Sequence, residues 1–208
     1  MISNQVVNNS ASEIGGVVYF SGIIPNPSPN LERHNVQLEN NQFDNNTAND
    51  GSVLYSYSPR GTQQFTMIGN TIRDSWGMTS GAVYFNTSIA DFHNWNNVWI
   101  NNTVENGTGA NVCIHVKEPS NITLRNETSQ NNHGESAWFV QGVGGVYGTL
   151  EVDGMTLSDT NTTSMIVSES ISSIELKDVV LLQYGTSEAI LANISSQNVT
   201  CSGALKVS

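Results

Sequence analysis

The feature that most constrains the fold is a short alternation of apolar and polar residues that recurs along the whole chain. Residues 121–126 show it most clearly, because Ile122 and Leu124 would share one face of a strand and the polar residues around them the other. A polar tract at residues 127–135 follows, and a second apolar run occupies residues 137–140. We interpret this unit as one coil of a solenoid: strand, bend, short strand, Asn-rich turn, strand and loop.

The same unit can be placed on the chain at seven starting points, separated by 29, 33, 24, 28, 24 and 25 residues. The first and third positions of every row are apolar, and the fifth is Asn, Gly or Asp, which accept a left-handed or tightly bent backbone. The first positions are Val36, Phe65, Val98, Ile122, Leu150, Ile174 and Val199; the third are Leu38, Met67, Ile100, Leu124, Val152, Leu176 and Cys201; the fifth are Asn40, Gly69, Asn102, Asn126, Gly154, Asp178 and Gly203.

A second alignment concerns the other end of the coil. Residues 7–20 match residues 72–85 without a gap at an offset of 65, so that Gly16-Val17-Val18-Tyr19-Phe20 falls on Gly81-Ala82-Val83-Tyr84-Phe85. Repeats of this length without helical periodicity predict an all-β fold, a parallel β-helix of about seven coils, with about 24–33 residues and three short strands per coil. We expect residues 1–208 to form a single segment of a longer solenoid, whose ends contact neighbouring coils or subunits end to end.

Three short motifs are Gly15-Gly16-Val17-Val18, Ser80-Gly81-Ala82-Val83 and Phe43-Asp44-Asn45-Asn46. With the repeat, they make the chain resemble the right-handed parallel β-helices of the pectin-lyase-like superfamily and, more loosely, the surface repeats of polymorphic outer-membrane-type proteins. The resemblance implies a fold rather than a function.

The charge and hydropathy patterns argue against two classes of partner. The chain has 18 acidic and 7 basic residues, a net charge of −11, and no run of Lys or Arg, so we expect no nucleic acid partner. It has no apolar stretch near the roughly 20 residues of a transmembrane helix, so we expect no membrane insertion.

Asn-x-Ser/Thr sequons are frequent and predict N-linked glycans on an extracellular or cell-surface protein. The alternative is that Asn-rich bends beside Ser and Thr generate such triplets by accident. Asn126 is excluded as an acceptor, because its amide should pack along the bend column. The predicted acceptors are Asn8, Asn45, Asn86, Asn101, Asn106, Asn121, Asn161, Asn193 and Asn198.

Glu151 and Glu175 are the candidate catalytic pair, since they fall in the same outward column on adjacent coils. The expected distance between their carboxyl groups is near the roughly 5 Å of a retaining glycosidase pair. Asp153 and Lys177 stack beside them. The alternative is a solvated face with an ion pair. The Asp-Asp and Gly-His-Gly signatures of polygalacturonases, which belong to the resembling superfamily, are missing, so we expect no catalytic residues.

Histidine, cysteine and tryptophan give no further site. His34, His93, His115 and His133 share no ligand spacing, so no metal or cofactor is expected. Cys113 and Cys201 lie in distant coils and are expected to be small buried hydrophobes without a disulfide. Trp99 is assigned to an outward column, where it could stack on a sugar; packing beneath residues 87–97 is the favoured alternative.

Together these patterns predict a non-enzymatic structural or adhesive segment of an extracellular, glycosylated surface or filament protein, with a surface polysaccharide as a candidate partner. The alternative function is a carbohydrate-active β-helix enzyme or a sugar-binding tail-fibre module.

Overall fold

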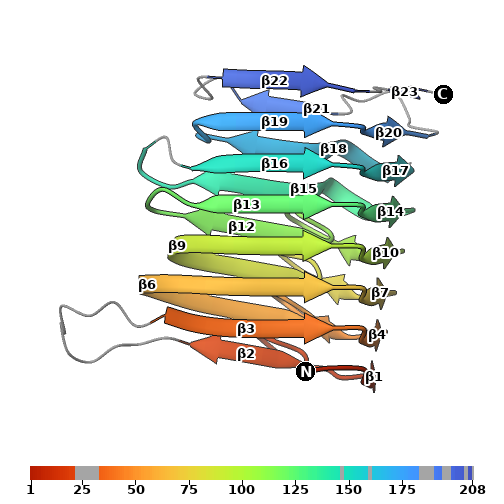
Figure 1. Cartoon of the computed structure of the whole chain (residues 1–208). Helices are drawn as coiled ribbons and strands as arrows, with labels where there is room; N and C mark the ends of the chain where they lie inside the picture. The colour runs from red at the N-terminus through yellow and green to blue at the C-terminus, as the bar shows by residue number, and fades with distance from the viewer. Residues whose placement is uncertain are drawn as a thin grey trace.

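The chain is a parallel β-solenoid in its computed structural model (Figure 1), which describes residues 1–21, 33–145, 148–158, 161–182, 190–193, 198–203 and 206–207. The described residues form strands, turns and bends and include no helix, hence none long and apolar enough to cross a membrane. Every pairing between the described strands is parallel. The predicted fold class is therefore confirmed.

The strands form three faces that stack along the solenoid axis (Figure 1). Face 1 contains β3 (Arg33–Glu39), the second parts of β6 (Leu54–Ile68) and β9 (Val83–Trp95), β13 (Asn121–Arg125), β16 (Thr149–Asp153), β19 (Ser173–Lys177) and β22 (Asn198–Ser202). Face 2 contains β2 (Val18–Ser21), the first parts of β6 and β9, β12 (Val112–Val116), β15 (His133–Gly142), β18 (Asn161–Glu169) and β21 (Ile190–Asn193).

Face 3 is a separate sheet, at the right edge of Figure 1, which stacks eight short strands; the number of coils therefore differs slightly from the seven expected. Its strands are β1 (Gln5–Val7), β4 (Gln42–Asp44), β7 (Thr71–Arg73), β10 (Val98–Ile100), β14 (Thr128–Gln130), β17 (Thr156–Ser158), β20 (Val180–Leu181) and β23 (Lys206–Val207). A further ladder of β5 (Thr47–Ala48), β8 (Trp76–Gly77) and β11 (Thr103–Val104) joins the start of β15 at the turn that leads toward face 2.

The core lies between the three faces and consists of the inward columns of each. On face 1 the predicted inward pairs are confirmed for six of the seven rows, for example Ile122 beside Leu150 and Leu124 beside Val152. These four side chains are almost fully excluded from solvent. The alternation of the sequence therefore reports which side of each strand faces the core.

The third predicted row on face 1 is wrong. Phe92, not Val98, pairs with Phe65 and Ile122, and Asn94 takes the inward position assigned to Ile100. Residues 98–100 instead form β10 on face 3. The pattern Val-x-Ile matched the template better than Phe-x-Asn, because the true row places a polar side chain in an apolar column.

The offset of 65 is also only partly right. Val18 stacks through Leu54 on Val83, as predicted, but Val6 rather than Val7 stacks through Phe43 on Ile72. The first coil therefore holds one additional residue between its face 3 strand and its face 2 strand. Val7 consequently points outward and is 41% exposed.

A bend separates face 1 from face 3, and one residue of each coil adopts a positive φ there. The predicted bend column is confirmed, except that Asn96 (φ 58°) replaces Asn102. These residues are Ser3, Asn40, Gly69, Asn96, Asn126, Gly154, Asp178 and Gly203. A second column of positive φ follows face 3 at Asn8, Asn45, Asp74, Asn101 and Asn131. Asn, Asp and Gly tolerate this conformation best, which explains the asparagine content of the turns.

Candidate functional site

A ladder of buried amides lies directly after the first bend. We call Asn4, Asn41, Asn70 and Asn97 the amide ladder. The Oδ1 atom of Asn70 accepts hydrogen bonds from the backbone N–H and Nδ2 of Asn41, both at 2.9 Å, and Asn97 receives the same pair from Asn70 at 2.8 and 2.9 Å. Asn41 receives the corresponding pair from Asn4. Each coil thus satisfies the donors of the coil before it.

Glu127 ends the amide ladder. Its Oε1 accepts the backbone N–H and Nδ2 of Asn97, each at 3.2 Å, while its Oε2 accepts Nε1 of Trp99 at 2.7 Å and Nδ2 of Asn94 at 3.2 Å. Both carboxyl oxygens of Glu127 accept hydrogen bonds here, which suits the last member of a series of donors. The residue after it in the same column, Met155, is apolar and fully buried.

The environment of Glu127 changes its protonation. Burial raises the pKa of this carboxyl to about 8, although hydrogen bonds from Trp99 and Asn97 act in the opposite direction. The same contacts explain two errors in the sequence interpretation. Trp99 does not lie in the outward column; it is 0% exposed on the inner side of β10 against Trp138, so the favoured expectation that this indole is packed is correct, although residues 87–95 belong to β9 and not to a loop. Asn94 is buried because it binds Glu127. This cluster is enclosed, so we assign it a structural role.

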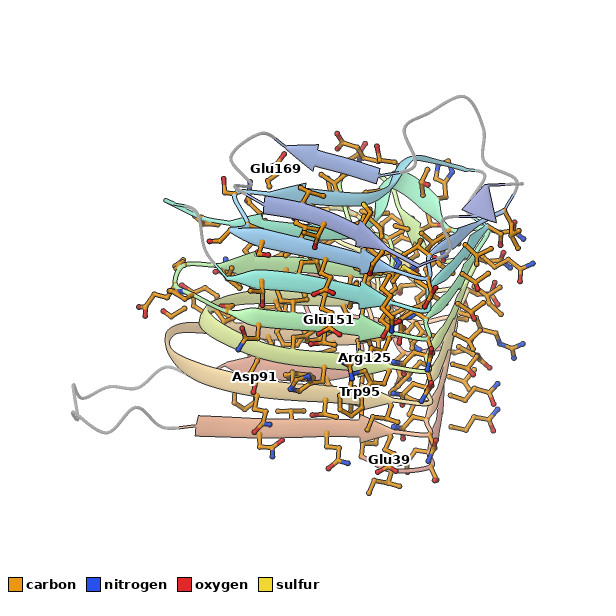
Figure 2. All side chains as sticks on the ribbon, turned by 45° about the horizontal axis from the view of Figure 1, so that its top comes forward. Glu39, Asp91, Trp95, Arg125, Glu151 and Glu169 are labelled. Atoms are coloured by element: carbon orange, nitrogen blue, oxygen red, sulfur yellow. The ribbon has the colours of Figure 1, made fainter. Side chains whose placement is uncertain are left out.

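The outer side of face 1 is the accessible candidate site, and Figure 2 shows several of its side chains on successive strands. One outward column runs Thr66, His93, Thr123, Glu151 and Glu175, and the next runs Ile68, Trp95, Arg125, Asp153 and Lys177. The predicted stacking of Glu151 on Glu175 and of Asp153 on Lys177 is confirmed.

Among the described side chains of this surface, both Arg125 and Lys177 lie beside a carboxylate. Nη2 of Arg125 donates to Oε1 of Glu151 at 2.6 Å, and Nζ of Lys177 donates to Asp153 at 3.1 Å. Nε2 of His93 lies 3.2 Å from Oδ1 of Asp91. Glu151 is therefore held in an ion pair rather than paired with Glu175.

A shallow hollow opens on face 1 between β9 and β13. Trp95, Asn96, Arg125 and Asn126 line it, and its volume is about 220 Å³. Trp95 and Arg125 are register partners on adjacent strands (Figure 2). Nδ2 of Asn126 donates to Oδ1 of Asn96 at 3.1 Å. The sequence interpretation missed this site because the shifted third row placed Trp99 in the outward position.

The outer side of face 2 carries a hydrogen-bonded chain across three coils. Oε2 of Glu169 accepts Nε2 of Gln141 at 2.7 Å, which turns Oε1 of Gln141 toward Nδ1 of His115 at 2.9 Å. Nδ1 of His115 then carries the proton, and the bare Nε2 faces Sγ of Cys113 at 3.4 Å. Cys113 therefore acts as the donor to an imidazole whose tautomer Glu169 fixes through Gln141.

The thiol in this series of hydrogen-bonded side chains is not accessible to substrates. Cys113 is 2% exposed and packs beside Tyr84, Phe139 and Val167 of the same column, and burial raises the pKa of its thiol to about 12. Burial also lowers the pKa of His115. A thiol of this kind stays protonated and inert.

The expectation for the two cysteines is only half right. Cys113 is buried and both cysteines are free, but Cys201 is exposed. Cys201 occupies the predicted inward column, where it stacks on Leu176. Among the described strands only β19 pairs with β22, so none of them covers its other edge, and the neighbouring Val199 is 49% exposed as well.

The predicted glycan acceptors occupy several environments. Asn8, Asn45, Asn101, Asn106 and Asn121 are exposed, and Asn86 is half-buried with its Nδ2 on the Tyr84 hydroxyl. Asn8, Asn45 and Asn101 lie in a positive-φ column, as the excluded Asn126 does in the other. Asn126 is itself exposed. The side chains of Asn161, Asn193 and Asn198 lie outside the described residues, and glycosylation stays a prediction.

Wherever the structure describes the chain, no three His, Cys, Asp or Glu side chains converge as metal ligands would. His93 and His115 belong to the contacts above, His133 is exposed on β15, and the side chain of His34 lies outside the described part. Comparison with known proteins gives no relative: no family model, no curated protein and no solved structure matches this chain.

Proposed function

We propose that this chain is a non-enzymatic structural and adhesive segment of an extracellular, glycosylated surface or filament protein. Its role is to hold a long, stiff surface, and face 1 is the surface that contacts partners. The observation that supports this proposal is the unbroken stacking of face 1, from β3 to β22, on which Arg125 and Lys177 are each paired with a carboxylate. Such a surface presents the same polar columns coil after coil, which suits a repetitive partner.

The edge of the solenoid supports a second element of the proposal. The outer edge of β22 carries backbone N–H and C=O groups beside the exposed side chains of Val199 and Cys201. An open parallel edge of this kind accepts another strand. We therefore include neighbouring coils or subunits, docked end to end, among the partners of this segment.

A polysaccharide panel tests the non-enzymatic role. The protein is incubated with neutral and acidic polysaccharides, and new reducing ends and unsaturated products are measured over time. We expect none above the level of a buffer control. If products form, and if a Glu151→Gln, Glu175→Gln double variant no longer forms them, the chain is a carbohydrate-active enzyme and the structural proposal fails.

Two further measurements test the remaining parts. Intact mass of native material, before and after glycosidase treatment, should fall by the mass of N-glycans; an unchanged mass refutes glycosylation. Light scattering over a concentration series should show association through the solenoid ends. A stable monomer at high concentration contradicts end-to-end docking.

A further inference from the structure

The hollow between β9 and β13 has the lining of a saccharide site. We propose that it binds one ring of a neutral saccharide, and this inference rests on the proposed adhesive role of face 1. Trp95 supplies an aromatic ring, Arg125 a planar array of donors, and Asn96 and Asn126 two amides, each with donors and an acceptor. Aromatic rings pack against the C–H face of a sugar, while amides and guanidinium groups bind its hydroxyls.

The size of the hollow favours a small unit. Its volume of about 220 Å³ lies below the roughly 300–1,000 Å³ of pockets that enclose drug-sized ligands. A single pyranose ring of a longer chain, with its neighbours lying along the polar columns of face 1, matches such a shallow depression better than a compact cofactor does.

Charge on face 1 selects a neutral sugar over an acidic one. The described side chains of this face include five carboxylates and two cations, and both cations are already paired. The carboxylates are Glu39, Asp91, Glu151, Asp153 and Glu175, and the cations Arg125 and Lys177. With a net charge of −11 on the whole chain, a polyanion would be repelled. Arg125, held by Glu151 through Nη2, keeps other N–H groups available for hydroxyls.

Two buried nitrogen atoms beside the hollow strengthen the argument. Nε1 of Trp95 and Nδ1 of His93 have no hydrogen-bond partner within the protein, and the two rings lie 5.3 Å apart. A buried polar group without a partner is unfavourable, so a ligand hydroxyl that reaches either nitrogen strengthens binding.

The experiment uses the full chain made without glycosylation, so that no N-linked glycan on a neighbouring sequon competes for the hollow. Neutral oligosaccharides of glucose, galactose and mannose and an oligogalacturonate are titrated, with saturation-transfer NMR and tryptophan fluorescence as readouts. We expect a neutral oligosaccharide to bind and the oligogalacturonate not to bind. Trp95→Ala should weaken binding about tenfold or more, and Arg125→Lys by a smaller factor, because Lys keeps the charge but loses the planar donors.

The matched control is Tyr19→Ala, which removes an exposed aromatic ring from face 2 and should leave affinity unchanged. Trp95→Phe keeps an aromatic ring and should retain part of the affinity, and the thermal unfolding of each variant shows that it is folded. Binding by Trp95→Ala within threefold of the unchanged protein, binding of the acidic oligomer alone, or no binding at all overturns the inference. Each of these results concerns binding and not cleavage, so the non-enzymatic proposal is tested separately by the polysaccharide panel.

Discussion

The amide ladder and the coils that follow it use the same bend but fill the space behind it differently. In the N-terminal half, the residue after the positive-φ position is Asn41, Asn70 or Asn97, and each is bonded to the next coil. In the C-terminal half, Met155 and Val179 take this position and are equally buried. Glu127 stands between the two halves. The comparison shows that a buried amide is acceptable only when the next coil offers an acceptor.

The largest expected effect comes from removing the end of the ladder. Glu127→Leu leaves buried donors on Asn94, Asn97 and Trp99 without an acceptor. Since each such group costs about 1–3 kcal/mol, we expect the free energy of unfolding to fall by about 3–5 kcal/mol. Urea unfolding monitored by circular dichroism measures it. The control, Met155→Leu, changes an apolar residue of the same column and should cost less than about 1.5 kcal/mol. Similar losses in both variants would remove the distinction between the two halves.

The second prediction uses the raised pKa of Glu127. The folded pKa of about 8 lies above the ordinary value of 4.5, so folding takes up a proton between these values. The stabilising contribution is complete below about pH 4.5 and is lost as the pH rises through about 8. Within that window the free energy of unfolding should fall by up to about 1.4 kcal/mol for each pH unit. Urea unfolding from pH 5 to 9 should show this slope, and Glu127→Gln should lack it. Equal slopes in the two proteins would assign the pH dependence to other groups.

A smaller effect is expected within the ladder. Asn70→Leu removes the side-chain acceptor of Asn41 and one of the two donors to Oδ1 of Asn97, while the backbone N–H of residue 70 still donates to that oxygen. We expect a loss of about 2 kcal/mol in the free energy of unfolding. The converse change, Met155→Asn, places an amide where Val179 offers no acceptor, and calorimetry should show it to be destabilising too. If Met155→Asn is neutral, the apolar half tolerates amides and the comparison fails.

The smallest effect is expected outside the core. Glu151→Gln removes the charge of the pair with Arg125, whose side chains are 36% and 46% exposed, respectively. Because solvent screens such a pair, the free energy of unfolding should change by no more than about 0.5–1 kcal/mol, which thermal unfolding measures. The same chemical change at Glu127 alters the pH dependence of stability, whereas here it should not. A large loss would show that face 1 contributes to stability through its ion pairs.

The fold could be predicted because its signal is local and repeated. The alternation at Ile122 and Leu124 identifies inward positions, and the Asn, Gly or Asp that follows marks the bend, without knowledge of any distant contact. The row at Phe92 could not be found in this way. Asn94 is acceptable in the core only because Glu127, which lies one coil later, binds it.

The candidate site was missed for the same reason. Once the third row is shifted, Trp99 takes the place of an outward residue and Trp95 falls into a loop, so the neighbour of Arg125 is lost. The hydrogen-bonded series of side chains Cys113, His115, Gln141 and Glu169 could not be predicted either, because it depends on the register of three face 2 strands. Glu151 with Glu175 and Asp153 with Lys177, which lie in rows that were aligned correctly, were placed as they occur.

The direction of the amide ladder also limits how such a gene can lengthen. Duplication of the coil that begins at Asn70 would insert one more amide, and the series would still end at Glu127. Excision of the coil that begins at Glu127 would instead place Asn97 next to Met155, which offers no side-chain acceptor, and the donors of Asn97 to Glu127 would lose their partner. Coils before Glu127 can therefore be gained or lost by recombination, whereas the coil of Glu127 must be inherited intact.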